Sequence, residues 1–387
     1  MPRRLGSFEA PPEPGLLGSY GREIAGLFTP AFLALHQISR LYTARTCLLL
    51  LQDLGWEARL RAGASLDDLC EGLSPQARKP LAWMLPFLAA EGLLREAEGT
   101  FTLSGEPDLD LAGLRAEAES EAPGHAANFD LLDGVRSHIP PFFTAGKPGE
   151  GLLFDLALFP LWLAYFRNEN RLYLPNNLLT LLALREGLAP EARILELGGG
   201  AGSFAQLVAQ RGAEEGWLGR IAEYRFTDVA PTFLRRAQRG LGAAAPGLPL
   251  AFQALDLNRP LDAQGLAPAS LDAIVGINVL HVARDLEATL TDLRGHLKPG
   301  GRLILGECLK PSLDAPLYLE FFFTFIQSFT EVQLDPRWRP RHGFLTPEAW
   351  DLALDHAGFH EIRHIPPPRP LMDRHPDFTV GAMTARA

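Results

Sequence analysis

The stretch "RILELGGGAGSF", residues 193–204, decides the fold of this 387-residue chain. Its first half has the apolar pattern of a buried β-strand, and its second half leads into the apolar spacing of a helix. Gly198, Gly199, Gly200 and Gly202 stand between the two and let the backbone turn tightly and approach a ligand. Since ligands of open α/β sheets lie beyond the carboxyl ends of the strands, the stretch predicts a ligand-binding turn at such an edge.

Two familiar glycine-rich sites fit this turn less well. A phosphate-binding loop would continue as Gly-Lys-Ser/Thr, which is absent, and a nicotinamide site would read G-x-G-x-x-G. The chain instead has E-x-G-x-G-x-G, with Glu196 ahead of the glycines. A carboxylate there would face a pyrophosphate badly and suits a ligand with a positive group, although a dinucleotide site stays open on this motif alone.

Strand and helix patterns alternate after this turn, which predicts a parallel sheet covered by helices on both faces. Polar residues follow the expected strands. Asp228 ends the second strand, where it could bridge a ribose diol, and Asp256 ends the third, where it could hold an exocyclic amine or only cap the strand. "GINVLH" closes the fourth strand, and "LKPGGRLIL" leads into the fifth.

Composition limits the classes of partner. Lys and Arg number 36 against 46 Asp and Glu, giving a net charge of −10, which argues against a large nucleic-acid footprint. No apolar run approaches the roughly 18 residues of a membrane span, and the first residues lack the apolar region of a secretion signal. Cys47, Cys70 and Cys308 are far apart and fit no zinc spacing. We expect a cytoplasmic protein with no membrane association and no metal.

The N-terminal third predicts a separate helical module. After an irregular arm over residues 1–25, residues 26–105 contain three helical patterns, the second of them short, and the hairpin-like "LREAEGTFTL", which is the order of a winged helix. Ser65 and Asp68 form a capping pair that opens a short helix. Residues 1–100 hold ten Lys or Arg against eleven Asp or Glu, so the basic stripe of a DNA-binding module is missing. We expect packing or homodimerisation instead.

Residues 106–188 are harder to assign. Their first part is rich in Ala, Glu, Gly and Pro and indicates a linker or a loosely packed helix. An apolar helical segment broken by Pro160 and Pro175 follows. The α/β domain then takes residues 189–387, with residues 311–345 as an insertion.

Residues 190–310 resemble a class I S-adenosylmethionine-dependent methyltransferase, and the finer resemblance is to C-methyltransferase domains of polyketide synthases. The resemblance rests on "RILELGGGAGSF", "YRFTDVAPTFLRRA", "ALDLNRPLDAQGL", "INVLHVARDLEATLTDLRGHLKPGGRLIL" and Glu307. "NRLYLPNNLL" also resembles that family's lid. "GGGAG" departs from the family's usual "GAGTG". The N-terminal module is similar to the one that makes the dimer in small-molecule O-methyltransferases.

The resemblance implies a Rossmann-like α/β fold with a seven-stranded, mostly parallel sheet, a winged-helix-like N-terminal domain and a helical lid. It implies S-adenosylmethionine as cofactor and S-adenosylhomocysteine as product. It places Glu196 near the methionine part of the cofactor, with the glycines beneath it. The other implied cofactor contacts are Asp228, Val229, Asp256, Leu257, Asn278 and Leu280. Asn278 could instead serve only to stabilise a turn.

Methyl transfer to carbon or oxygen also needs a base. His281 follows the fourth strand and Glu307 ends the next, so adjacent strand ends could bring the two together. The resemblance implies a His–Glu dyad that generates an enolate. The open alternative is a loop histidine that is merely hydrogen-bonded to Glu307.

The acceptor is the least defined part. Tyr173 could close over the cofactor or acceptor, or only pack. The phenylalanines of "LYLEFFFTFIQSF", with Phe322, Phe325 and Phe329 as substrate candidates, are either core residues or the roof of an apolar acceptor pocket. "RWRPRH", with Arg337, is either a solvated loop or a docking spot for an anionic group such as a carrier protein's phosphopantetheine. We therefore expect a small-molecule or carrier-tethered acceptor, C-methylated in polyketide-type biosynthesis, with O- or N-methylation and non-methylating cofactor binding as alternatives.

Overall fold

The computed structural model describes residues 24–27, 29–374 and 379–387, so all but the last two residues of the predicted N-terminal arm lie outside the described part. Its described residues divide into two compact units. The first comprises residues 29–165 and 312–331, and the second comprises residues 24–27, 166–311, 332–374 and 379–387. No helix among the described residues is long and apolar enough to cross a membrane.

The second unit is built on one seven-stranded sheet with the order β6-β5-β4-β7-β8-β10-β9. Neighbouring strands from β6 to β8 are parallel, and β10 runs antiparallel to both β8 and β9. The strands are β4 (Ala192–Leu197), β5 (Ile221–Asp228), β6 (Leu250–Ala254), β7 (Leu271–Ile277), β8 (Leu297–Cys308), β9 (His360–Ile365) and β10 (Val380–Arg386). The expected seven-stranded, mostly parallel Rossmann-like fold is confirmed.

Helices cover both faces of this sheet, because its central strands are apolar on both sides. In β4, five of the six residues are buried, as befits a strand with a neighbour on each edge. The helices α14 and α16 contact each other on one face, whereas α12 contacts both α11 and α13. The helices are α11 (Leu174–Glu186), α12 (Ser203–Glu214), α13 (Pro231–Ala244), α14 (Leu286–His296), α16 (Pro347–His356) and α17 (Pro368–Arg374), with the 3₁₀ turns η2 (Ala25–Leu27), η4 (Leu218–Arg220), η5 (Asp262–Gln264) and η6 (Leu280–Val282).

The first unit contains the helices and the hairpin expected for its N-terminal module, together with a short helix over Glu57–Ala62 and a short strand over Ala64–Ser65 that the sequence patterns missed. The chain runs through α2 (Pro30–Asp53), α3 (Glu57–Ala62), β1 (Ala64–Ser65), α4 (Leu66–Cys70), η3 (Pro75–Ala77), α5 (Arg78–Ala90), β2 (Leu94–Ala97) and β3 (Thr100–Leu103). The strands form an antiparallel sheet in the order β1-β3-β2. The predicted capping box of Ser65 and Asp68 is confirmed at the start of α4. A role of this module in packing or dimerisation stays a prediction.

The stretch expected to be a linker or a loosely packed helix is helical. In it α6 (Leu111–Glu121) and α7 (Ala126–His138) both contact α2, because Leu114, Ala118, Phe129, Leu132 and Val135 supply a buried apolar face. The elements α8 (Pro140–Ala145), α9 (Gly149–Leu153) and α10 (Phe159–Tyr165) complete this part of the unit. The structure therefore places residues 106–165 with the N-terminal module and only residues 166–188 with the sheet, so the expected single segment 106–188 is divided.

The expected insertion 311–345 is divided in the same way. Residues 312–331, which include η7 (Tyr318–Glu320), η8 (Phe323–Phe325) and α15 (Gln327–Thr330), belong to the first unit. Their contacts there include the hydrogen bond from Trp83 Nε1 to the Glu320 carboxylate, at 2.9 Å. Residues 332–345 belong to the second unit.

One close contact fixes α11 on the sheet. A Cβ atom added at Gly306 of β8 would lie 2.1 Å from Thr180 Oγ1 and 3.1 Å from the Asn176 carbonyl oxygen of α11. The guanidinium of Arg302, also on β8, donates to the carbonyls of Ala183 and Leu184 at the other end of the helix. The missing side chain at position 306 thus lets α11 approach the strand that ends in Glu307.

We predict that Gly306→Ala lowers the free energy of unfolding by about 1–3 kcal/mol, because the added methyl group overpacks this contact. The matched control is Gly295→Ala in α14, where an added Cβ meets nothing within 4 Å and helix propensity favours alanine. Urea unfolding of both variants checks this. Equal stability of the two variants would contradict the described packing of α11.

Candidate active site

The glycine turn joins the end of β4 to α12. Gly198, Gly200 and Gly202 have φ angles of 56°, 51° and 78°, a region that side chains other than glycine rarely adopt. A Cβ at Gly199 would lie 2.1 Å from the ring of Phe226, and one at Gly198 would lie 2.5 Å from Val279 Cγ2. All four glycines are therefore required by the backbone, and they leave the carboxyl edge of β4 without side chains.

Asp228 holds this turn against the end of β5. Its two carboxylate oxygens accept hydrogen bonds from the Gly200 N–H at 2.9 Å and the Ala230 N–H at 2.7 Å. Burial raises the pKa of this carboxyl group, and the two N–H donors oppose that shift. The following residue, Val229, is exposed over 65% of its surface, and its contact with a cofactor stays a prediction.

Glu196 is a buried carboxyl group at the end of β4. It is 1% exposed, and its Oε2 accepts the hydroxyl hydrogen bond of Tyr224 from β5 at 3.0 Å. Burial raises the pKa of Glu196 to about 8, with the Tyr224 hydrogen bond lowering it and the charge of Asp228 raising it. The sequence analysis missed Tyr224, although its place on the neighbouring strand could have suggested the contact.

His281 and Glu307 meet between the ends of β7 and β8, as the sequence predicts. His281 Nδ1 lies 2.7 Å from Glu307 Oε2, and the exposed fractions are 3% and 0%. The other oxygen of Glu307 accepts from the N–H groups of Val279 at 3.2 Å and Leu280 at 3.0 Å. One carboxylate thus fixes both the imidazole and the backbone of the turn η6 that carries it.

Asn278 precedes this turn with a φ angle of 49°. Its side-chain Oδ1 accepts from the Cys308 N–H at 2.9 Å, and its own N–H donates to the Gly306 carbonyl at 2.7 Å. These two hydrogen bonds stabilise the turn, which is the alternative role that the sequence left open for Asn278. Leu280 is fully buried. Contacts of Asn278 and Leu280 with a cofactor stay predictions.

Tyr173 stands immediately before α11. Its ring packs edge-on against Phe166, with 5.3 Å between centroids. Burial, and next the negative charges of Cys308, Glu196 and Glu307, raise the pKa of its hydroxyl group. Tyr173 therefore lies near both buried carboxyl groups, and its hydroxyl keeps its proton at neutral pH.

Asp256 and Leu257 follow β6 and are half-buried. One oxygen of Asp256 accepts from the Asn258 N–H at 2.9 Å, so the residue does cap the strand end. The Leu257 carbonyl accepts from Thr289 Oγ1 at 3.2 Å. A contact of either residue with adenine stays a prediction.

The predicted substrate residues lie in different surroundings. Phe322, Phe325 and Phe329 are at most 4% exposed and pack in the first unit, where Phe325 contacts Phe142 and Phe322 contacts Trp162. The phenylalanines are therefore core residues, as one of the two sequence alternatives predicts. They lie on several short helical segments instead of on a single helix. Arg337 belongs to the second unit, where its guanidinium pairs with Asp335 at 2.6 Å and lies over the Trp338 ring. A substrate role for these four residues stays a prediction.

Two residues that the sequence analysis did not assign to the site surround His281. Arg339, expected with Arg337 on a docking loop, is 1% exposed and donates to the carbonyl oxygens of His281 and Ala283. Phe344 packs edge-on against the His281 imidazole, with 4.6 Å between centroids. Nothing in the spacing of "RWRPRH" distinguishes the buried arginine from the exposed one.

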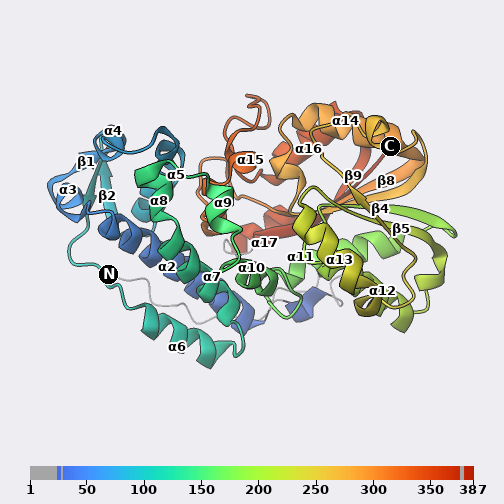
Figure 1. Ribbon diagram of the computed structural model, residues 1–387, viewed down its shortest axis with the longest axis horizontal. Helices are drawn as coiled ribbons and strands as arrows, with labels where there is room; N and C mark the ends of the chain where they lie inside the picture. Colours follow the sequence, from blue (N-terminus) through green and yellow to red (C-terminus); the bar gives the residue numbers. More distant parts are fainter. Residues whose placement is uncertain (1–23, 28, 375–378) are drawn as a thin grey trace. The chain divides into compact units, whose positions relative to one another are not determined.

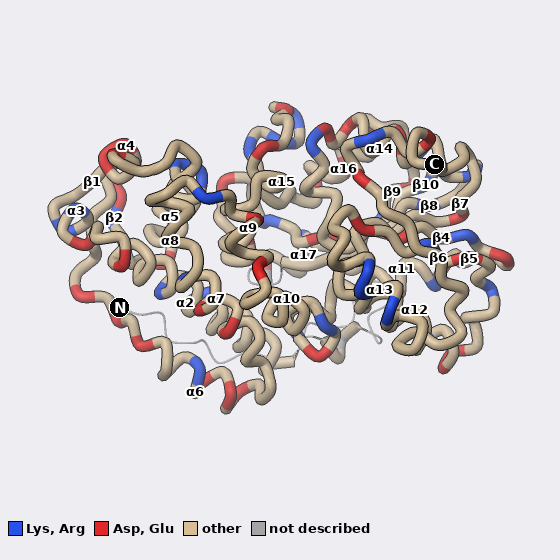
Figure 2. The backbone as a smooth tube through the Cα atoms, in the orientation of Figure 1, with Lys and Arg blue, Asp and Glu red and all other residues tan. Residues whose placement is uncertain are grey.

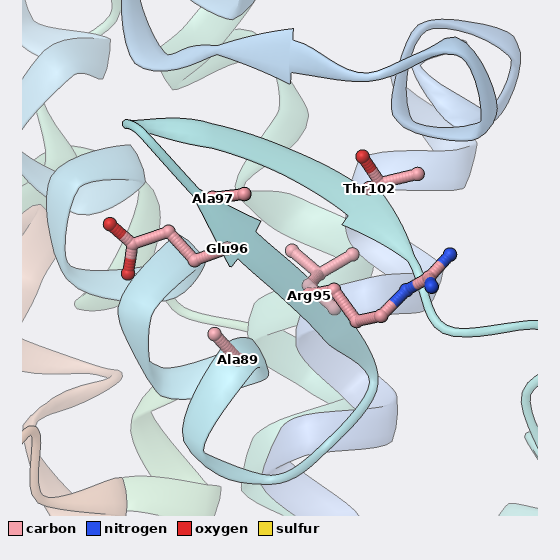
Figure 3. A pocket seen from close by; sticks show the side chains of 6 residues that line it. Ala89, Arg95, Glu96, Ala97 and Thr102 are labelled. Atoms are coloured by element: carbon pink, nitrogen blue, oxygen red, sulfur yellow. The ribbon is translucent and has the colours of Figure 1, made fainter.

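A hollow of about 570 Å³ lies elsewhere, at the hairpin of the first unit (Figure 3). It is lined by Ala89, Leu94, Arg95, Glu96, Ala97 and Thr102. The two charged side chains of β2 point in different directions there, and the six lining residues include no His, Cys or Lys. Among the described residues, no cluster of three or more His, Cys, Asp or Glu side chains could hold a metal ion.

Comparisons with known proteins agree with this geometry. Residues 195–303 match the model of a methyltransferase domain family. The polyketide synthase ThaQ of Burkholderia thailandensis is 28% identical over 357 residues, which are 86% of this chain and 16% of that protein. The CurJ carbon methyltransferase superposes with a TM-score of 0.73 at 20% identity, covering 97% of this chain and 98% of that one. The second unit therefore carries a methyltransferase domain, on a fold that it shares with carbon methyltransferases.

The expected relation of this methyltransferase domain to polyketide synthase C-methyltransferase domains is confirmed. A further fold relative is the trans-methyltransferase CalH in complex with S-adenosylhomocysteine, with a TM-score of 0.64 at 20% identity over 91% of this chain and 90% of that one. The chain spans less than a fifth of the length of the synthase ThaQ.

The buried carboxyl group of Glu196 predicts a pH dependence of stability. Because the folded protein holds this proton up to about pH 8 while the unfolded chain releases it near pH 4.5, stability falls as pH rises between these values. We expect Glu196→Gln to flatten this fall, measured as the free energy of urea unfolding from pH 5 to pH 8.5. Glu361→Gln, at an exposed carboxylate paired with Arg386, is the control and should retain the wild-type slope. An unchanged slope in Glu196→Gln would refute the assignment.

Proposed function

We propose that the protein C-methylates an acidified carbon of a β-keto-like acceptor, free or tethered to a carrier protein, in polyketide-type biosynthesis. The observation that carries the proposal is the buried His281–Glu307 pair. Glu307 lies on the strand next to β7, and β7 in turn neighbours β4, which leads into the glycine turn. A general base is thereby supplied at the same edge of the sheet as the expected cofactor site.

The residues of this edge fit S-adenosylmethionine. The glycine turn offers backbone without side chains, and the raised pKa of Glu196 indicates a carboxyl group that a cationic ligand would stabilise as the anion. Asp228 keeps acceptor capacity beyond its two N–H donors, which suits ribose hydroxyl groups. When bound, the cofactor supplies a methyl group on a positively charged sulfur, and this sulfur keeps the electron pair of the S–C bond when the methyl group is transferred.

His281 would act through Nε2. With the Nδ1 hydrogen donated to Glu307, the imidazole lone pair lies on Nε2, and the carboxylate stabilises the ring when it becomes protonated. Nε2 takes the proton from the acceptor carbon, and the electron pair left behind forms the enolate that accepts the methyl group. The Tyr173 hydroxyl, which keeps its proton, is a donor that could face the enolate oxygen or close the site.

The same base could remove a hydroxyl proton, so O-methylation of a free small molecule is the alternative. The relation to polyketide synthases and to carbon methyltransferase folds supports carbon as the acceptor atom. The test is the product formed from a β-ketoacyl N-acetylcysteamine thioester and isotopically labelled cofactor. Label on the α-carbon in NMR supports the proposal, and label on an enol ether overturns it.

We predict that His281→Gln and Glu307→Gln each lower kcat by at least about 100-fold, because general-base catalysis contributes on the order of 10²–10⁴-fold. His281→Gln is expected to bind S-adenosylhomocysteine within about threefold of the wild type, measured by calorimetry. His360→Gln, at an exposed histidine on β9, is the matched control and should keep wild-type turnover. Wild-type turnover in His281→Gln would refute the dyad.

A further inference from the structure

Arg339 is a buried cation at a position where burial of an uncharged side chain would cost less free energy. It is 1% exposed and forms no ion pair within the described residues. Burial lowers its pKa to about 10, and the charges of Glu307 and Asp285 partly offset this at longer range. A buried charge without an ion-pair partner is destabilising, so packing alone does not explain an arginine at this position.

The contacts of Arg339 supply the explanation. Its two terminal guanidinium nitrogens donate to the carbonyl oxygens of His281 and Ala283. The Ala283 distance is 2.8 Å. The His281 carbonyl belongs to the turn η6, and the Ala283 carbonyl follows the turn directly, so the two lie on either side of Val282. The planar fork of arginine can hold both at once, which a lysine ammonium at the end of a flexible stem does less well.

The loop that carries Arg339 is itself fixed. Asp335 and Arg339 exchange backbone hydrogen bonds of 2.9 and 2.8 Å, and the Gln333 N–H donates to the Arg284 carbonyl at 2.7 Å. Phe344, at the far end of the loop, packs against the His281 imidazole. The turn η6 is thus held from two sides, by Glu307 at its N–H groups and by Arg339 at its carbonyl groups.

We propose that Arg339 is a positioning residue for methyl transfer, which fixes the turn of His281 so that the imidazole stays aligned between Glu307 and the acceptor. This inference rests on the proposed base role of His281. The residue acts through the turn, whose carbonyl groups it holds. Glu307 and Asp285 are charged groups that act on Arg339, and Cys308, Glu196 and Glu307 act on Tyr173.

The first test compares Arg339→Met, which keeps the volume and removes the fork, with Arg339→Lys, which keeps the charge. We expect Arg339→Met to lower kcat by about 10- to 100-fold with S-adenosylhomocysteine affinity unchanged, because small misplacements of a catalytic group have costs of this order. Arg339→Lys should recover part of the loss. Arg363→Met, at an exposed arginine paired with Glu186, is the matched control and should behave as the wild type.

The second test needs no acceptor. Imidazole resonances of histidine-labelled protein, assigned with His281→Gln, report the titration and the Nδ1 hydrogen of His281. In Arg339→Met we expect the ring resonances of His281 to shift and its Nδ1 hydrogen signal to broaden, because the turn that carries the imidazole loses two hydrogen bonds. Unchanged resonances and pH profile in a folded Arg339→Met would overturn the inference. If these resonances shift but the wild type methylates no carbon acceptor, the proposed function fails while the positioning role stands.

Discussion

The site depends on the carboxylate of Glu307. This fully buried group accepts two backbone N–H bonds from the turn after β7 and pairs with the imidazole of His281. A buried carboxylate without such partners would strongly destabilise the fold. The hydrogen bonds to Glu307 therefore fix the positions of the turn and of the imidazole. The neighbouring strand positions 306 and 308 serve the same arrangement, since Gly306 admits α11 and the Cys308 N–H donates to Asn278.

The two buried carboxyl groups at this edge of the sheet have different surroundings. Glu307 accepts two backbone N–H bonds and pairs with the imidazole of His281, whereas Glu196 accepts one hydrogen bond from Tyr224 and its pKa rises to about 8. A raised pKa means that Glu196 gains most from a cationic neighbour. The chain therefore keeps one carboxylate for orienting a base and a second carboxyl group that suits a positively charged ligand. Figure 2 shows that Asp and Glu residues and Lys and Arg residues are distributed along the chain in both units.

Much of this arrangement follows from the sequence. Strand-end positions are predictable because parallel strands present their carboxyl ends at one edge, which placed Asp228, His281 and Glu307 together with the glycine turn. The sequence could not show that residues 312–331 fold with the N-terminal module, because apolar phenylalanines predict burial without naming a partner. It also could not separate Arg339 from Arg337, since which side of a loop turns inward depends on carbonyl groups that are distant in sequence. For residues 111–138 a helix was only one of two alternatives, because alanine and glutamate dominate a stretch whose few apolar residues still suffice to pack on α2.

The central claim is that His281, oriented by Glu307, removes a proton from an acceptor carbon. The most direct measurement is exchange of the α-protons of a β-ketoacyl thioester in deuterated water, with S-adenosylhomocysteine present so that no methyl group is transferred. The account predicts exchange above the uncatalysed rate with the wild-type protein and only the uncatalysed rate with His281→Gln and Glu307→Gln. Equal exchange in the wild type and both variants, or methylation by a wild type that catalyses no exchange, would contradict it.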